Sequence, residues 1–193
     1  MKKRNILMLI FISGILLLSS CGKISSLGTN IINGKRGEML MSDGQKADAR
    51  MDQIVSAVKD KDREAIKSLF SQKALDEAND IDSGIDYLFD FIQGDIESWE
   101  REKLTSEQSI DYGKKSEMIA SWYIINTEYD KYLFIIIDYS IDTIEPQNAG
   151  LYTVFAVKEE ERDMHYTYWT EIKIAGIYKP AQGDGSPDYP NTH

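Results

Sequence analysis

The stretch "KYLFIIIDYSID", residues 131–142, indicates the fold class because it has the pattern of a long β-strand. Its β-branched and aromatic side chains are those enriched in strands, and alternation assigns them to two opposite faces. One face is nearly apolar and carries Leu133, Ile135, Ile137, Tyr139 and Ile141. The other face is mixed and carries Tyr132, Phe134, Ile136, Asp138 and Ser140. The apolar face is suited to a core against helices, so we expect the mixed face to point away from that core.

Further stretches of the same character surround this segment and predict a sheet. They are residues 98–113, 116–127, 150–159 and 168–178, and turn-like sequences such as "GKK", "YDK" and "EPQNAG" separate them. Short connections between successive strands favour antiparallel pairing. We therefore expect an antiparallel meander of about four to five strands.

Helical periodicity precedes the strands. Apolar residues recur at intervals of three and four after Asp43, and a second short helix is expected from Asp62 as its N-cap. A third helix is expected over residues 81–93, with Gly94 placed to end it. Three N-terminal helices followed by strands predict an α+β fold in which the helices pack on one face of a curved antiparallel sheet. The length fits one domain over residues 43–179.

The N-terminal residues have the pattern of a lipoprotein signal peptide. Lys2, Lys3 and Arg4 precede an apolar run over residues 6–18, which is shorter than the about 20 residues of a membrane-spanning helix. The run leads into "LLLSSC", residues 16–21, which resembles the bacterial lipobox and contains the only cysteine of the chain. We expect residues 1–20 to be removed and Cys21 to carry a diacylglyceryl thioether, since two acyl chains anchor a protein stably.

The expected mature protein is acidic and lies at the extracytoplasmic face of the cell membrane. Removal of residues 1–20 takes away three cations, so the formal charge falls from −10 to −13. Such a chain has no electrostatic footprint for nucleic acid, and its lipid rather than its charge holds it to the membrane. We expect residues 21–42 to form a flexible tether and residues 180–193 to form a disordered tail.

The residues that carry chemistry show no catalytic or metal-binding signature. Cys21 is taken by the lipid, so no thiol nucleophile, disulfide or cysteine-based metal site remains. The only internal histidine, His165, lies in a polar segment and is expected to be solvated. No phosphate-binding or hydrolase motif occurs, and the acidic residues 76–86 lack the ligand spacing of a calcium-binding loop. We therefore predict no catalytic residue, no cofactor and no metal site.

Three stretches carry a family resemblance. They are "MDQIVSAVKDKDREAIKSLFS" (51–71), "GIDYLFDFIQGDIESWE" (84–100) and "DTIEPQNAGLYTVFAV" (142–157). They are similar to the DUF5104 lipoproteins of Gram-positive bacteria, over about residues 43–178. The order of a helical pair, a third helix and a curved meander also resembles the NTF2-like, or cystatin-like, superfamily. That resemblance implies a cone-shaped fold with a cleft between the helices and the concave sheet, and it implies no particular activity.

Two classes of function are compatible with these features. The first is a non-catalytic binding module for a protein, a peptide or an envelope component. Its cleft is lined or filled by the large side chains Trp99, Trp122 and Tyr139. Its mixed sheet face, which also suits a homodimer, carries Tyr123, Phe134, Asp138 and Tyr152. The second class is a small hydrolase or isomerase acting in the cone, with Asp138 as a candidate because it follows three isoleucines. The missing catalytic motifs favour the first.

Overall fold

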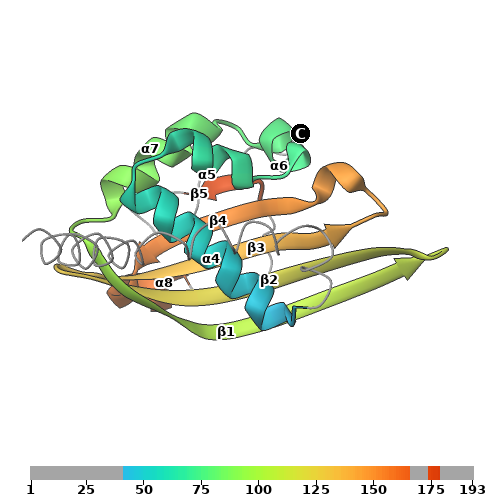
Figure 1. Ribbon diagram of the computed structural model, residues 1–193. Coiled ribbons are helices and arrows are strands. Elements are labelled where there is room, and N and C mark those ends of the chain that lie inside the picture. Colours follow the sequence, from blue (N-terminus) through green and yellow to red (C-terminus); the bar gives the residue numbers. More distant parts are fainter. Residues whose placement is uncertain (1–40, 166–173, 179–193) are drawn as a thin grey trace, which may run out of the picture. The chain divides into compact units, whose positions relative to one another are not determined.

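The computed structural model describes residues 41–165 and 174–178, in which helices precede a sheet (Figure 1). This order confirms the expected α+β class. The helices are α4 (Asp43–Lys59), α5 (Arg63–Leu69), α6 (Gln72–Glu77), α7 (Ile81–Phe91) and α8 (Arg162–His165), with short 3₁₀ turns η1 (Pro146–Asn148) and η2 (Glu159–Glu161). The strands are β1 (Ile96–Asp111), β2 (Lys114–Thr127), β3 (Lys131–Asp142), β4 (Gly150–Lys158) and β5 (Gly176–Tyr178).

The five strands form one sheet in the order β1-β2-β3-β4-β5. Antiparallel pairing joins β1 to β2, β2 to β3 and β3 to β4, which confirms the predicted meander for these strands. The last strand differs, because β5 pairs with β4 in parallel and makes the sheet mixed. Of the strand predicted over residues 168–178, the described residues 174–178 contain the strand Gly176–Tyr178, and residues 168–173 lie outside the described part.

Side-chain caps explain where the helices begin. Ser42 and Gln45 form a capping box at the start of α4. The side chains of Asp62, Ser71 and Asp80 each accept a hydrogen bond from the backbone N–H three residues later, at the starts of α5, α6 and α7. The expected N-cap at Asp62 is thus confirmed. Helix α6 was not predicted, because it is only 6 residues long and buries a single side chain.

The expectation about the two sheet faces is wrong, because the helices cover the mixed face. Met51, Ile54, Ile85 and Leu88 from the helices belong to one buried cluster with Tyr123, Tyr132, Phe134 and Ile136 from the sheet. We call this side of the sheet the helix-covered face. Alternation separates side chains into two sets, but it does not say which set the helices choose. Two charged residues of α4, Lys46 and Arg50, pair with buried carboxylates on this face.

The other side of the sheet holds a second, smaller cluster. Its buried members are Ile124, Leu133, Ile135, Phe155 and Val157, with Trp122 and Tyr178 packed against them. We call this side the opposite face. The apolar residues that were expected to meet the helices therefore form a separate layer on the far side of β2, β3 and β4.

Several predictions fall on residues outside the described part of the chain. They concern the signal peptide (1–20), the lipidation of Cys21, most of the tether (21–42) and the tail (180–193). Across residues 41–165 and 174–178, no helix has both the length and the apolar character needed to cross a bilayer.

Candidate functional site

Two residues predicted for an exposed partner face lie beneath the helices. Tyr123 and Phe134 both have 0 % of their surface exposed, so neither offers surface to a partner. The hydroxyl of Tyr123 donates a hydrogen bond to Asp48 Oδ1 of α4 at 3.1 Å. Burial, followed by the negative charge of Asp48, raises the pKa of Tyr123. These side chains hold α4 against the sheet, which corrects the prediction that they form an exposed aromatic surface.

The three aromatic residues predicted for a cleft are not brought together. Trp99 meets Tyr123 edge-to-face on the helix-covered face, with ring centroids 5.4 Å apart. Trp122 packs against the opposite-face cluster, and Lys103 Nζ lies 4.7 Å from its ring centroid. Tyr139 instead contacts Tyr152, with ring centroids 5.9 Å apart. The three residues therefore line no common cleft.

Tyr152 joins the sheet to helix α6. Its hydroxyl donates a hydrogen bond of 2.6 Å to Glu77 Oε2. Burial and this hydrogen bond raise the pKa of Tyr152. Nearby, Lys73 Nζ of the same helix is 3.0 Å from Glu145 Oε2, beyond the end of β3. These contacts attach α6 to the sheet and leave Tyr152 protonated, so it acts as a hydrogen-bond donor.

Buried carboxylates lie between α4 and the sheet. Asp138 is 4 % exposed, and its Oδ1 accepts a hydrogen bond from Arg50 Nε of α4 at 2.9 Å. Glu117 is 1 % exposed and forms an ion pair with Lys46 of the same helix. A buried charge requires such a partner, because desolvation alone is strongly unfavourable. These two pairs fix α4 on the helix-covered face.

Glu117 accepts hydrogen bonds from four side chains. Besides Lys46, the donors are Lys115 Nζ at 2.5 Å, Ser140 Oγ at 2.6 Å and Gln108 Nε2 at 3.1 Å. Burial raises the pKa of Glu117, but the hydrogen bonds from Lys115, Lys46 and Ser140 outweigh burial and lower the pKa to about 2. A general base works best with a pKa near the operating pH. Glu117 is thus suited to holding the fold together and poorly suited to proton transfer.

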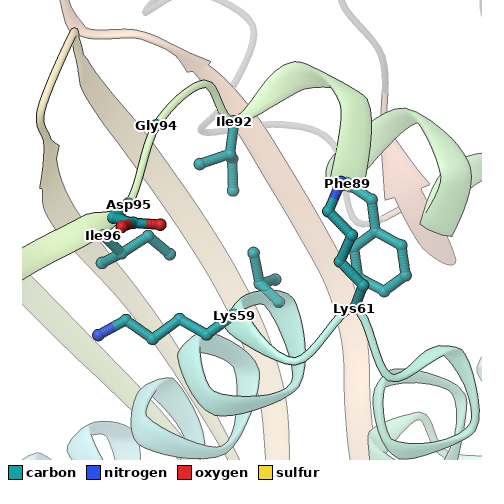
Figure 2. Close-up of a pocket in the computed structure, with 8 residues that line it drawn as sticks. Lys59, Lys61, Phe89, Ile92, Gly94, Asp95 and Ile96 are labelled. Carbon is teal, nitrogen blue, oxygen red and sulfur yellow. The ribbon is translucent and has the colours of Figure 1, made fainter.

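A pocket of about 460 Å³ opens between the end of α4 and the connection from α7 to β1 (Figure 2). We call it the α4–α7 pocket. Its lining residues come from two segments of the chain, and they are Val58, Lys59, Lys61, Phe89, Ile92, Gly94, Asp95 and Ile96. Sequence reasoning missed it: the segment "KDKD" was interpreted only as a turn, and nothing local indicates that residues 89–96 lie against it.

Two left-handed backbone corners shape the rim of the α4–α7 pocket. Lys61 has φ of 49°, and its backbone N–H donates to Val58 O at 3.1 Å as the chain leaves α4. Gly94 has φ of 80°, and a Cβ atom there would lie 2.7 Å from the ring of Tyr129. Glycine adopts such a conformation without a steric cost. The two corners lie in the segments that bring the exposed residues Lys61 and Asp95 to the lining of the pocket.

The α4–α7 pocket combines an apolar interior with unpaired charges. Val58, Ile92 and Ile96 are buried, whereas Lys59, Lys61 and Asp95 are exposed. Figure 2 shows Lys59 extending along the side of Asp95 and Ile96, and Lys61 along the side of Phe89. No ion pair joins these three charged side chains to another residue of the described part. Two free ammonium groups beside apolar surface favour a ligand with an apolar body and an anionic group.

The described residues contain no group of side chains suited to hold a metal ion. Across residues 41–165 and 174–178, no three side chains of the types that hold metals lie close enough to share an ion. The acidic residues near α7 have other partners: Asp80 caps the helix, while Asp82 and Asp86 form ion pairs with Arg63.

Comparison with protein families gives a match over the folded part of the chain. The model described as "Domain of unknown function (DUF5104)" matches residues 53–159, which is more than half of the chain. The matched region contains every residue that lines the α4–α7 pocket. A comparison with curated proteins finds no match.

Proposed function

We propose a function from the geometry of the site, since the chain belongs to the DUF5104 family, whose description names no activity. The protein is a lipid-anchored, non-catalytic binding module at the extracytoplasmic face of the cell membrane. It uses the α4–α7 pocket to bind a small ligand that has an apolar body and an anionic group. We also propose that the fold is NTF2-like, as the sequence resemblance implies. Helices that pack on a curved sheet can leave a pocket of this kind between them and the sheet.

The composition of the α4–α7 pocket is the observation that carries the proposal. Buried Val58, Ile92 and Ile96 provide apolar surface, and Lys59 and Lys61 provide two cations that no described carboxylate neutralises. Ligand pockets typically have this composition, with mostly apolar walls and a few polar groups that fix orientation. Asp95 disfavours a second anionic group on its side of the pocket, and it therefore selects the orientation of the ligand.

The lipid anchor is supported by the N-terminal sequence. A cationic start, a short apolar run and "LLLSSC" place the only cysteine of the chain where a lipobox has its modified residue. A diacylglyceryl group on Cys21 would supply two acyl chains, which are sufficient for stable anchoring. In membrane fractionation of cells that express the full chain, we expect Cys21→Ala to release the protein. A variant that stays in the membrane fraction contradicts the anchor.

The ligand site is tested with the full chain and 8-anilinonaphthalene-1-sulfonate, a fluorescent probe that has an apolar body and one anionic group. We expect Lys59→Gln/Lys61→Gln to weaken probe binding by about fivefold, because exposed charge pairs contribute up to about 1 kcal/mol in total. Lys114→Gln/Lys131→Gln is the matched control, since it removes two exposed cations elsewhere on the molecule. Equal affinity in the two double variants would rule out the α4–α7 pocket.

A second candidate function is a hydrolase or isomerase that acts beneath α4. One observation favours it: Asp138 is a buried carboxylate on the helix-covered face, beside Arg50 of α4. Active sites often contain such charges. Asp138→Asn in a chain that still folds separates the two candidates. Loss of the cellular phenotype would support catalysis, whereas a retained phenotype favours a structural role for the ion pair with Arg50.

A further inference from the structure

The turn between β1 and β2 contains a residue that does not suit its backbone. The two central residues are Tyr112 and Gly113, with φ of 45° and 81°. Two-residue hairpin turns of this kind favour Asn, Asp or Gly at both positions, because side chains with a Cβ atom are crowded at positive φ. Glycine meets this requirement at the second position. A bulky tyrosine at the first position is unfavourable for the backbone.

Nothing within the described fold compensates for Tyr112. Its side chain is fully exposed, and Ile110 beside it is 74 % exposed. Every residue from 105 to 114 is exposed, and a Cβ atom at Gly113 would have no neighbour within 4 Å. The end of the hairpin therefore presents two large apolar side chains that contribute nothing to the core. Backbone strain that the fold itself does not require is an indication of function.

We propose that the tip of the β1–β2 hairpin, Ile110 and Tyr112, inserts among the lipid headgroups of the membrane that carries the Cys21 anchor. This inference rests on the lipid anchor proposed above. Tyrosine is favoured at a membrane surface because its ring enters the apolar boundary while its hydroxyl stays hydrated. Ile110 adds apolar surface on the same protrusion. The protein then contacts the membrane at two points, the lipid and the hairpin.

The position of α4 brings the first described residues of the folded unit close to the strand that leads into the hairpin. Asp43, the first residue of α4, accepts a hydrogen bond of 2.6 Å from Ser106 Oγ of β1. Figure 1 shows the blue start of α4 beside this strand. Ser106 is six residues from Tyr112 along the chain, a distance of about 20 Å for a β-strand. The chain that comes from Cys21 thus enters the folded unit near the base of the hairpin.

The length of the connecting chain allows both contacts at once. Residues 22–41 connect Cys21 to the folded unit that begins at Ser42. Twenty residues reach at most about 70 Å when fully extended. This reach exceeds the about 20 Å from the base of the hairpin to its tip. A lipid on Cys21 and a hairpin tip in the same leaflet are therefore geometrically compatible.

The charge of the hairpin is compatible with a lipid surface. The lipidated chain that begins at Cys21 has an expected net charge of −13, which anionic headgroups repel. The hairpin differs, because residues 103–116 contain three lysines and only two carboxylates. Asp111 pairs across the turn with Lys114 in the strand register, so the apex is close to neutral. Anionic headgroups therefore repel the hairpin less than they repel the rest of the chain.

The other end of the sheet provides a matched control. Tyr129 lies in the turn between β2 and β3 and is 70 % exposed. This turn and the β1–β2 hairpin are at opposite ends of β2. Exposed tyrosines therefore exist at both ends of the sheet. The start of α4 lies nearer to the end with Tyr112, and Tyr112 has a strained backbone with positive φ whereas Tyr129 does not, so the proposal predicts membrane contact at the end with Tyr112.

The test places an environment-sensitive nitrobenzoxadiazole label at either end of the full lipidated chain. Cys21 is the only cysteine and is blocked by its lipid, so Ser109→Cys and Glu128→Cys each provide a single reactive thiol. Both proteins are reconstituted in phosphatidylcholine vesicles that contain spin-labelled lipid. We expect the label at position 109 to be quenched at least twofold more than the label at position 128. Adding Ile110→Ser/Tyr112→Ser should abolish the difference, whereas adding Tyr129→Ser should preserve it.

Two failures are distinguishable in this experiment. If both labelled proteins remain with the vesicles but are quenched equally, the hairpin does not insert and the anchor stands. A label at position 109 that stays exposed to water in this case overturns the proposal. If neither protein sediments with the vesicles and the N-terminal peptide has no lipid mass, the anchor itself is wrong and the hairpin proposal falls with it.

Discussion

Replacing Glu117 by glutamine is expected to destabilise the protein strongly, because this residue neutralises a buried cation of α4. The substitution keeps the size of the side chain, removes its charge and replaces one of its two acceptor oxygens by an NH2 donor. Lys46 has 9 % of its side chain exposed, so its ammonium group loses its counter-charge without gaining water. Lys115 has 36 % of its side chain exposed and can be hydrated instead. The loss of stability therefore arises mainly from the buried ammonium group of Lys46.

Two physical arguments give the size of the expected loss in the free energy of unfolding. Removing one partner of a buried ion pair typically costs about 3–5 kcal/mol. The pKa of Glu117 falls from its ordinary value of 4.5 to about 2 on folding. At about 1.36 kcal/mol per pH unit, this fall corresponds to about 3 kcal/mol of stability from the ionised form. We therefore expect the free energy of unfolding to fall by about 3 kcal/mol at pH 7, a large part of the about 5–15 kcal/mol that is typical of a domain.

The pH dependence of this effect has a definite sign. The pKa of Glu117 is lower in the folded state than in the unfolded state, so folding favours the ionised carboxylate. Its contribution is fully present above about pH 4.5 and disappears as the pH falls towards about 2. The difference between the wild-type protein and Glu117→Gln should shrink over that window. Asp142, whose pKa is also lowered by hydrogen bonds despite its burial, is present in both proteins and cancels in the difference.

Urea unfolding followed by tryptophan fluorescence measures the effect, in full-length proteins that all carry Cys21→Ala for solubility. Asp86→Asn is the control, because the ion pair of Asp86 with Arg63 is largely exposed and such pairs contribute less than about 1 kcal/mol. A loss for Glu117→Gln that is no larger than the loss for Asp86→Asn would refute the structural role of Glu117. A difference that stays constant from pH 5 to pH 2 would refute the proposed ionisation.

Three further substitutions test backbone conformation by thermal and urea unfolding. Gly150→Ala should cost more than about 2 kcal/mol, because φ is 128° and the new Cβ atom would lie 2.9 Å from Ser71 N and 3.1 Å from Leu69 O. Gly113→Ala also changes a glycine at positive φ but has open space around it, so a loss of about 1 kcal/mol is expected, and equal losses would contradict the steric explanation. Tyr112→Asn should raise the free energy of unfolding by about 1 kcal/mol, since asparagine tolerates the left-handed turn. A neutral or negative effect would show that the tyrosine is not strained.

The sequence allowed the elements to be predicted where the signals are local. Residues 131–142 form β3 with the predicted bounds, and Asp62 caps α5 as expected. Both signals depend on neighbours within a few residues, namely alternation along a strand and one side-chain hydrogen bond at a helix start. The order of helices and strands then predicts the α+β class. Helix α6 was missed because a six-residue helix has too few turns to show a periodic pattern.

The sequence did not predict how the site residues are grouped, because a site is made by contacts between segments that are distant in the chain. Trp99 and Trp122 lie on opposite faces of the sheet, and Tyr123 is fully buried. The α4–α7 pocket forms where residues 58–61 meet residues 89–96, and no feature of either segment indicates the other. The strained turn at Tyr112 was equally invisible, because the sequence "DYGKK" shows that a turn occurs and not which residue takes positive φ.

The sequence by itself determined the elements, their order and the division of each strand into two sets of side chains. Only the tertiary structure decided which set the helices cover. The choice depends on pairs such as Arg50 with Asp138, which are 88 residues apart, and Lys46 with Glu117, which are 71 residues apart. Alternation is symmetric between the two faces, so apolar content alone favoured the wrong one. Buried carboxylates that need cationic partners broke that symmetry, because their charge is tolerated only where α4 supplies Lys46 and Arg50.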